Sequence, residues 1–182
     1  SFGGSSTNPC CHGAKLYLNG TELTDIIIPS DITEIKTCAF DTCTSLTSVT
    51  IPDSVTSIGG HAFKGCDSLT SVTIPDSVTS IGYYAFGNCS SLTSIIVSEG
   101  NTVYDSRDNC NAIIETATNR LILGCQSTTI PDSVTSIGAR AFDGCTSLTS
   151  VTIPDSVTEI GDRAFELCLS LTSVTIGNGV TS

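Results

Sequence analysis

A 23-residue repeat constrains the fold of this chain more than any other feature of its sequence. The dipeptide Ile-Pro recurs at intervals of 23, 23, 56 and 23 residues, and the long interval equals one unit of 23 plus one of 33. The isoleucines of these dipeptides are Ile28, Ile51, Ile74, Ile130 and Ile153. A unit this short cannot bury its own apolar side chains, so successive units must stack and share one interior.

The end of each unit alternates apolar and polar residues, as a half-buried strand does. In the unit that ends at Ile74, Val72 and Ile74 fall on one face, and Ser71 and Thr73 fall on the other. Pro75 has no N–H to donate, so the strand should end there in a Pro-Asp-Ser turn. A glycine further along each unit permits a sharp corner, and the Ala-Phe pair after it predicts one short helical turn.

The repeat divides the chain into four segments. They are an N-terminal tail with a hairpin (1–27), regular repeats (28–97), an irregular repeat with a hairpin insertion (98–129), and regular repeats ending in a truncated unit (130–182). Within the irregular segment, residues 111–116 and 120–124 predict a hairpin that protrudes from the stack. The truncated last unit leads us to expect that the chain was cut from a longer protein.

The repeat LxxVxIPxxVxxIGxxAFxxCxx resembles the leucine-rich repeats of BspA-like (Treponema-type) bacterial surface proteins. The resemblance runs from Ile28 to the end, and the unit Tyr104–Cys125 is similar to irregular repeats of that family. It implies an α/β leucine-rich-repeat solenoid rich in β-structure, a curved right-handed stack of parallel strands with short helical or 3₁₀ turns on the outer side. It also implies a secreted or cell-surface location and a role in adhesion or binding without catalysis.

Charge and motif content exclude several classes of function. Seven Lys and Arg against eighteen Asp and Glu give a net charge of −11, which disfavours nucleic acid and anionic membranes as partners. The longest apolar runs are far too short to insert in a bilayer. The sequence contains two histidines and no phosphate-binding, metalloprotease or serine-hydrolase motif, so we expect neither a cofactor nor enzyme activity.

Five of the ten cysteines occupy one repeat position, where a small apolar filler is the expected role. They are Cys43, Cys66, Cys89, Cys145 and Cys168. Counting outward from the turn of the irregular hairpin brings Cys110 close to Cys125, so a disulfide is expected there if the chain is exported. Cys38 and His61 share a variable, solvent-facing repeat position and suggest a nucleophile pair. No orienting third group accompanies them, which argues against catalysis.

The outward positions of the strands form the expected binding face. These positions are Ser48, Thr50, Ser71, Thr73, Ser94, Ile96, Ser150, Thr152, Ser173 and Thr175. An acidic row flanks them, consisting of Asp53, Asp76, Asp132 and Asp155. Calcium or a basic partner would use that row, whereas turn chemistry after proline explains it without a ligand, and the sequence favours the latter. We therefore assign no metal site.

Three functions compete for this surface. The first is a binding module that recognises an extracellular or host protein, or a glycan, through the solenoid. The second is a structural spacer that displays another domain of a longer surface protein. The third is an ice-binding-like array of Ser and Thr, which the expected curvature of the sheet disfavours. A hydroxyl-rich face without aromatic anchors predicts weak binding that depends on many copies.

Overall fold

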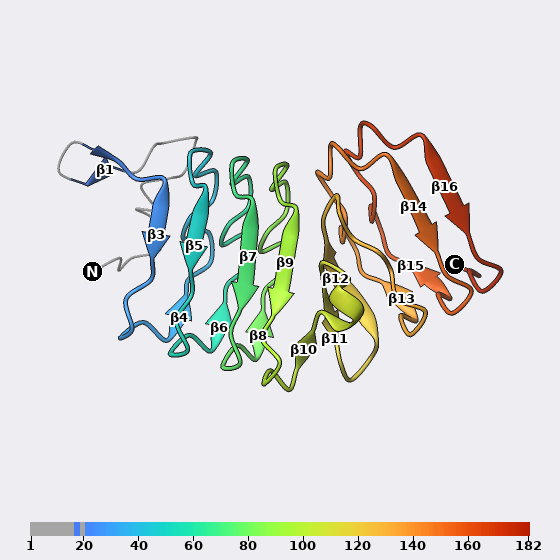
Figure 1. Ribbon diagram of the computed structural model, residues 1–182, viewed down its shortest axis with the longest axis horizontal. Coiled ribbons are helices and arrows are strands. Elements are labelled where there is room, and N and C mark those ends of the chain that lie inside the picture. Colours follow the sequence, from blue (N-terminus) through green and yellow to red (C-terminus); the bar gives the residue numbers. More distant parts are fainter. Residues whose placement is uncertain (1–16, 19–20) are drawn as a thin grey trace.

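The computed structural model describes residues 17–18 and 21–182, and the regular units in it stack as coils of a solenoid (Figure 1). Each coil contributes one longer strand to one side of the stack. These strands are β3 (Asp25–Ile27), β5 (Ser48–Thr50), β7 (Ser71–Ile74), β9 (Ser94–Val97), β14 (Ser150–Ile153) and β16 (Ser173–Ile176). We call their outward surface the long-strand face. The pairs β3–β5, β7–β9 and β14–β16 are parallel and in register.

A second strand of two residues follows the Pro-Asp-Ser turn in each regular coil. These short strands are β4 (Glu34–Ile35), β6 (Ser57–Ile58), β8 (Ser80–Ile81), β13 (Ser136–Ile137) and β15 (Glu159–Ile160). The sheet β4–β6–β8 and the pair β13–β15 are parallel. The turn itself is closed by the Val55 N–H, which donates to the Pro52 carbonyl, and the same bond recurs in later coils. The predicted strand end at proline is confirmed.

Burial follows the predicted alternation. Val72 and Ile74 of β7 are buried, whereas Ser71 and Thr73 are exposed, and β14 has the same pattern. Inside the stack the phenylalanines form columns, because Phe63 lies between Phe40 and Phe86 with ring centroids 5.1 and 5.0 Å away. Equivalent residues of successive coils therefore share continuous apolar columns, as the repeat predicted.

Threonine side chains also fasten one coil to the next. The Thr56 hydroxyl donates to the Thr33 carbonyl, and that of Thr79 donates to the Thr56 carbonyl one coil later. Thr93 makes the same bond to the Thr70 carbonyl at the opposite end of the long strand. Many of the hydroxyl groups of this chain therefore serve the stack itself rather than a ligand.

The Gly-x-x-Ala-Phe segments, here called the outer turns, differ from the short helices that were expected. None of them is helical, and the one helical element of the described residues is the 3₁₀ helix η1 (Arg107–Asn109) in the irregular unit. Residues at two positions of each outer turn have positive φ, for example His61 at 58° and Gly65 at 68°. As a result alternate N–H groups point along the stack, and those of His61 and Phe63 donate to the Tyr83 and Ala85 carbonyls of the next coil.

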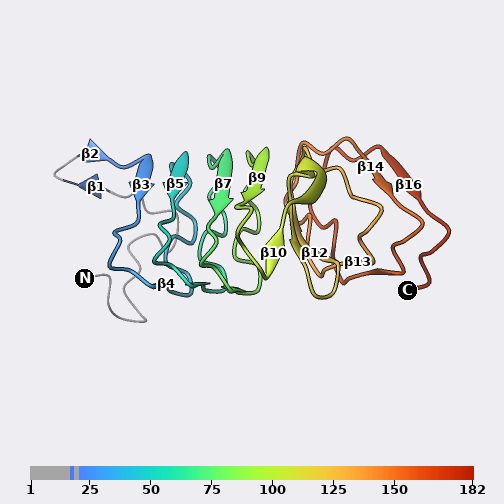
Figure 2. The ribbon, with the colours of Figure 1, turned by 60° about the horizontal axis from the view of Figure 1, so that its bottom comes forward.

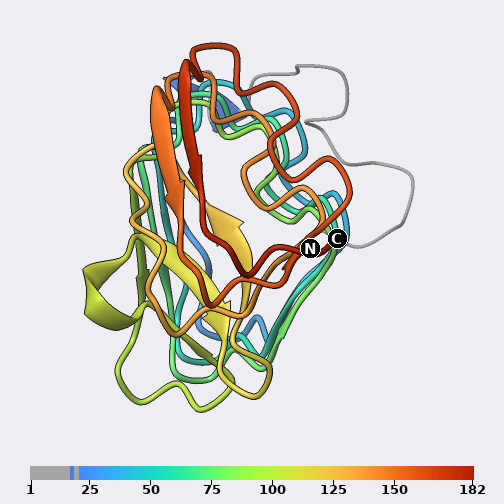
Figure 3. The ribbon, with the colours of Figure 1, turned by 90° about the vertical axis from the view of Figure 1, so that its right-hand side faces the viewer.

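The irregular unit consists of β10 (Tyr104–Asp105), η1, β11 (Ala112–Glu115) and β12 (Arg120–Gly124). The expected β11–β12 hairpin is present, but it does not protrude. Its second strand pairs in parallel with β13, so the hairpin continues the sheet of short strands in the order β10–β11–β12–β13–β15. In Figure 2 it lies inside the stack between β9 and β14. The segment that stands out from the stack is η1 (Figure 3).

This hairpin separates two hydrophobic cores. Ile113 and Cys125 belong to the core of the N-terminal coils, whereas Ala112, Ile114 and Leu121 belong to the core of the C-terminal coils. Strands buried on both faces carry continuous apolar runs rather than alternation, and the run Ala112–Ile114 fits that pattern. The irregular unit is therefore a wall that both halves of the solenoid share.

The N-terminal hairpin is present as β1 (Tyr17–Leu18) and β2 (Thr21–Glu22), which pair antiparallel. The two residues between these strands, 19 and 20, and the tail before β1, which includes Cys10 and Cys11, lie outside the described residues. Within the part of the chain that the structure describes, no helix has the length and apolar character needed to cross a membrane.

Candidate functional site

The long-strand face presents the predicted hydroxyl groups in register. Ser71 lies beside Ser94 and Thr73 beside Ile96 on β7 and β9, and the pairs Ser150–Ser173 and Thr152–Thr175 repeat this arrangement on β14 and β16. Ser48 and Thr50 of β5 lie beside Asp25 and Ile27. Eight of the ten predicted positions are exposed, and Ser48 and Ser94 are half-buried.

The face is divided into two patches. The long strands β3, β5, β7 and β9 lie next to one another, whereas the irregular unit separates β9 from β14 (Figure 1). Viewed along the stack in Figure 3, η1 stands out from the side that carries the long strands. A rigid flat partner could not contact both patches at once, whereas an extended flexible segment could follow either of them.

Asp25 places a negative charge at the first coil of this face. Its Oδ1 atom accepts hydrogen bonds from Ser48 Oγ at 2.5 Å and from Thr47 Oγ1 at 3.2 Å, and Oδ2 accepts one from Thr24 Oγ1 at 2.9 Å. These bonds, chiefly that of Ser48, favour the ionised form and lower the pKa of Asp25. The carboxylate of Asp25 therefore stays ionised to lower pH than that of an ordinary aspartate.

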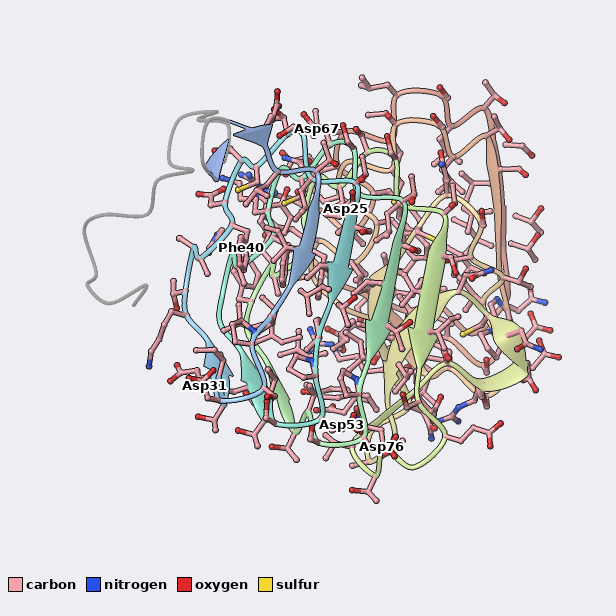
Figure 4. The ribbon with its side chains drawn as sticks, turned by 60° about the vertical axis from the view of Figure 1, so that its left-hand side comes forward. Asp25, Asp31, Phe40, Asp53, Asp67 and Asp76 are labelled. Carbon is pink, nitrogen blue, oxygen red and sulfur yellow. The ribbon has the colours of Figure 1, made fainter. Side chains whose placement is uncertain are left out.

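The acidic row follows the rim where the long strands end. All four of its carboxylates, on Asp53, Asp76, Asp132 and Asp155, are exposed, and Figure 4 shows Asp53 and Asp76 on one rim with Asp31. Asp155 Oδ1 accepts a bond of 2.7 Å from the Asn178 N–H. The other three carboxylates make no hydrogen bond or ion pair within the described part of the chain. They therefore do not form the bonds to the turn backbone that the sequence predicted.

The two predicted sets of residues meet in one shallow groove of about 420 Å³. Thr152 and Thr175 of the long strands line it on one side, and Asp132 and Asp155 of the acidic row line it on the other. The groove is open and combines hydroxyl groups with two carboxylates. No group of three His, Cys, Asp or Glu side chains suited to a metal occurs among the described residues.

The cysteine column is buried as expected, except that Cys168 is half-buried. The Cys66 and Cys89 thiols donate to the Phe40 and Phe63 carbonyls of the preceding coil, both at 3.2 Å, which gives this small residue a polar role as well. Cys43 is disulfide-bonded, so it is not only the apolar filler that the sequence predicts for this position. The other four members of the column, namely Cys66, Cys89, Cys145 and Cys168, are free thiols.

The predicted Cys110–Cys125 disulfide is also wrong, because both thiols are free. A β-bulge between Ile113 and Ile114 shifts the register of the hairpin, so that Ala112 lies opposite Gly124. Counting on from that pair no longer places Cys110 opposite Cys125. The two side chains lie in different cores, one on each side of the wall.

The variable column of the outer turns holds aromatic and cationic side chains. The His61 ring lies edge-on to the Tyr83 and Tyr84 rings, at 5.9 and 5.7 Å between centroids. The Arg140 guanidinium lies 5.2 Å from the centroid of the Tyr84 ring and forms ion pairs with Asp143 and Glu166. Burial and the nearby Asp143 carboxylate raise the pKa of Tyr84, so its hydroxyl stays protonated.

A second hollow, which sequence reasoning missed, opens beside this column. It has a volume of about 220 Å³ and lies between the outer turn of residues 82–87 and the irregular unit with the coil after it. Tyr83, Tyr84 and Tyr104 line it together with the charged Arg120 and Glu115. The sequence signal was the adjacent pair Tyr83-Tyr84 at two positions where the other repeats carry different residues. We call this hollow the junction cleft.

Comparison with known proteins assigns the family. The repeat family described as "BspA type leucine rich repeat region" matches residues 13–120 and 113–182, with six copies. A leucine-rich cell surface protein from Faecalibacterium prausnitzii A2-165 is 36% identical, with a TM-score of 0.74, over 88% of this chain and 43% of its own. The pneumococcal vaccine antigen PcpA shares the fold, with a TM-score of 0.66 at 20% identity, over 92% of this chain and 47% of its own.

The chain thus spans less than half the length of each of these two solved structures. No curated protein is significantly similar to it. The 23-residue units, the parallel long strands and the matched repeat region lead to one conclusion: the chain belongs to the BspA-type leucine-rich repeat proteins.

Proposed function

We propose that this chain is a non-enzymatic binding module of a bacterial cell surface, and that its long-strand face recognises a basic segment of an extracellular or host protein. The observation that carries the proposal is the groove in which Thr152 and Thr175 meet the free carboxylate of Asp132 and that of Asp155. Family membership and the cell-surface relative support the location.

The negative charge of the chain favours a positively charged partner. The chain carries a net charge of −11. Part of this charge lies on the acidic row, whose carboxylates form no ion pair with a lysine or arginine of the described chain. A segment rich in Lys or Arg would pair with the rim while its backbone and polar side chains bond to the hydroxyl rows. Because these contacts are exposed, added salt should weaken binding.

A structural spacer is the second candidate. It is favoured by the threonine bonds that fasten each coil to the preceding one, such as Thr79 to Thr56 and Thr158 to Thr135. They occur on both sides of the irregular unit and stiffen the stack. A stiff stack suits a rod that holds another domain away from the cell.

Binding to immobilised extracellular-matrix proteins distinguishes the two functions. The test variant combines Ser71→Arg, Thr73→Arg and Thr152→Arg, which add bulk and positive charge to exposed positions of the long-strand face. The matched control combines Thr44→Arg, Ser147→Arg and Ser170→Arg, which add the same charge at exposed turn positions outside the strands.

The proposal predicts that wild-type protein and the control variant bind a basic matrix protein, that the test variant does not, and that salt weakens the binding. Equal binding by both variants would reject the long-strand face as the site. Absence of binding by the wild type to every matrix protein would favour the spacer.

A further inference from the structure

The hydrogen-bond ladder of the outer turns has a gap at the junction cleft. In the regular coils one N–H of each outer turn donates to a carbonyl of the next coil. These bonds run from Cys38 to Gly60, from His61 to Tyr83 and from Arg140 to Asp162. The corresponding groups at the junction are the Tyr84 N–H and the Ala139 carbonyl, and neither has a hydrogen-bond partner among the described residues.

The gap arises because the irregular unit has no outer turn of its own. The coils on either side approach each other directly at one end of the turn, where the Asn88 N–H donates to the Asp143 carbonyl at 3.3 Å. Toward the middle of the outer turn, the Gly124 N–H of the irregular unit donates a hydrogen bond of 2.8 Å to the Ala141 carbonyl. Beyond that point the coils diverge, and the junction cleft opens with Tyr84 and Ala139 both in its lining.

The walls of the cleft combine aromatic, apolar and charged groups. Tyr83 is 59% exposed, although most of the aromatic side chains that the structure describes are buried. Tyr104 is buried in the cleft lining and accepts a hydrogen bond from the Ile81 N–H at 3.1 Å. The Arg120 guanidinium lies over Gly138, where an added Cβ would be 3.3 Å from its Nε atom.

The unpaired groups select a ligand that both donates and accepts. A hydroxyl group can accept a hydrogen bond from the Tyr84 N–H and donate one to the Ala139 carbonyl, whereas a carboxylate only accepts. The charges of the cleft do not favour an anion either. Arg140 is already paired with Asp143 and Glu166, and Arg120 lies in the lining together with Glu115, which is its partner across the hairpin. An uncharged polyol fits these conditions best.

Shape and size restrict the polyol further. An exposed tyrosine ring offers an apolar face on which the C–H face of a sugar can stack. The volume of about 220 Å³ lies below the range of about 300–1,000 Å³ that is typical of drug-sized ligands. We propose that the junction cleft binds one neutral hexose ring of a glycan, with a sugar hydroxyl bridging the Tyr84 N–H and the Ala139 carbonyl.

This site is separate from the long-strand face, so the two can be tested independently. Saturation-transfer NMR on the whole chain would use the methyl glycosides of glucose, galactose, mannose and N-acetylglucosamine as probes, with glucuronate as the charged comparison. Two variants test the cleft, namely Tyr83→Ala, which removes the exposed ring, and Ala139→Leu, which fills the space. The long-strand variant with three arginines serves as the control, because its substitutions lie outside the cleft.

The proposal predicts transfer to at least one neutral glycoside, an affinity roughly tenfold lower in Tyr83→Ala, loss of transfer in Ala139→Leu, and no change in the control. Absence of transfer to every glycoside would overturn it and leave water as the occupant of the cleft. Unchanged transfer in both cleft variants, or preferential binding of glucuronate that salt weakens, would also contradict it.

Discussion

Ile113 and Ile114 are adjacent in the chain, yet their side chains are buried in two different hydrophobic cores. Both are fully buried, because β11 has one core on each of its faces. The irregular unit therefore joins the two halves of the solenoid through shared packing. In the sequence the irregular unit resembles an insertion that interrupts the repeat. In the fold it is the partition against which both hydrophobic cores pack.

Replacing Ile114 with Ala is expected to lower the free energy of unfolding by about 2–5 kcal/mol, because it leaves a cavity in the wall. Urea unfolding of the variant should remain a single transition, since both cores depend on the same hairpin. Ser127→Ala, at an exposed position of the same unit, should change stability by less than about 0.5 kcal/mol. Two separate transitions in the wild type, only one of them affected by Ile114→Ala, would contradict the shared wall.

Phe63→Ala is expected to cost about 3–5 kcal/mol, because the Phe63 ring is fully buried between two other phenylalanine rings. Thermal and urea unfolding measure the loss. Tyr83→Ala, which removes an exposed ring from the neighbouring coil, should cost less than about 1 kcal/mol and provides the comparison. Similar losses in the two variants would show that the phenylalanine column does not carry the packing.

Cys110 and Cys125 should be recovered as free thiols even from protein prepared under oxidising conditions. The bulge that shifts the hairpin register and the wall between the two side chains both prevent a bridge. Peptide mapping without reduction, with alkylation before and after unfolding, gives the answer directly. A peptide in which Cys110 is linked to Cys125 would show that the register or the wall is wrong.

Stability is expected to fall at alkaline pH because of the buried thiols. Burial raises the pKa of Cys66 from its ordinary value of 9.0 to about 12, and that of Cys110 to about 11. Above pH 9 the unfolded chain releases these protons while the folded chain keeps them, so ionisation favours unfolding. The stabilisation is complete below pH 9 and is lost as the pH rises toward 12.

Urea unfolding across this pH range tests the assignment, with Cys66→Ala as the matched variant. Removing one buried thiol should make the decline of the unfolding free energy with pH less steep. If the wild type and Cys66→Ala declined in parallel, the Cys66 thiol would not be the group that titrates.

The regular coils were predictable because the same residues that determine strands, turns and buried positions recur every 23 residues. The alternation around Val72 fixes the strand and its buried face, and Pro75 fixes its end. The expected inward orientation of the phenylalanine and cysteine columns follows from the same period. These features depend on local patterns that recur in each unit, so a single sequence is sufficient to derive them.

The outer turns and the irregular unit could not be derived in the same way. In the outer turns, non-glycine residues such as His61 and Arg140 have positive φ, and the identity of these residues does not predict that conformation. Ile113 and Ile114 are both buried because coils distant in sequence cover the two faces of β11, and the bulge that shifts the hairpin register has no local sequence signal. The junction cleft exists only because two coils separated by the irregular unit meet at one end and diverge at the other.

The most direct test of the proposed function is methyl NMR of the chain, alone and with the matrix protein that binds it most tightly. Thr73, Ile96 and Thr152 carry exposed methyl groups on the long-strand face, and Thr79 carries one in the turn before β8, away from the long strands. The proposal predicts that the signals of the first three shift on binding and that the Thr79 signal does not. Shifts at Thr79 without shifts at Thr73, Ile96 and Thr152 would contradict recognition through the long-strand face.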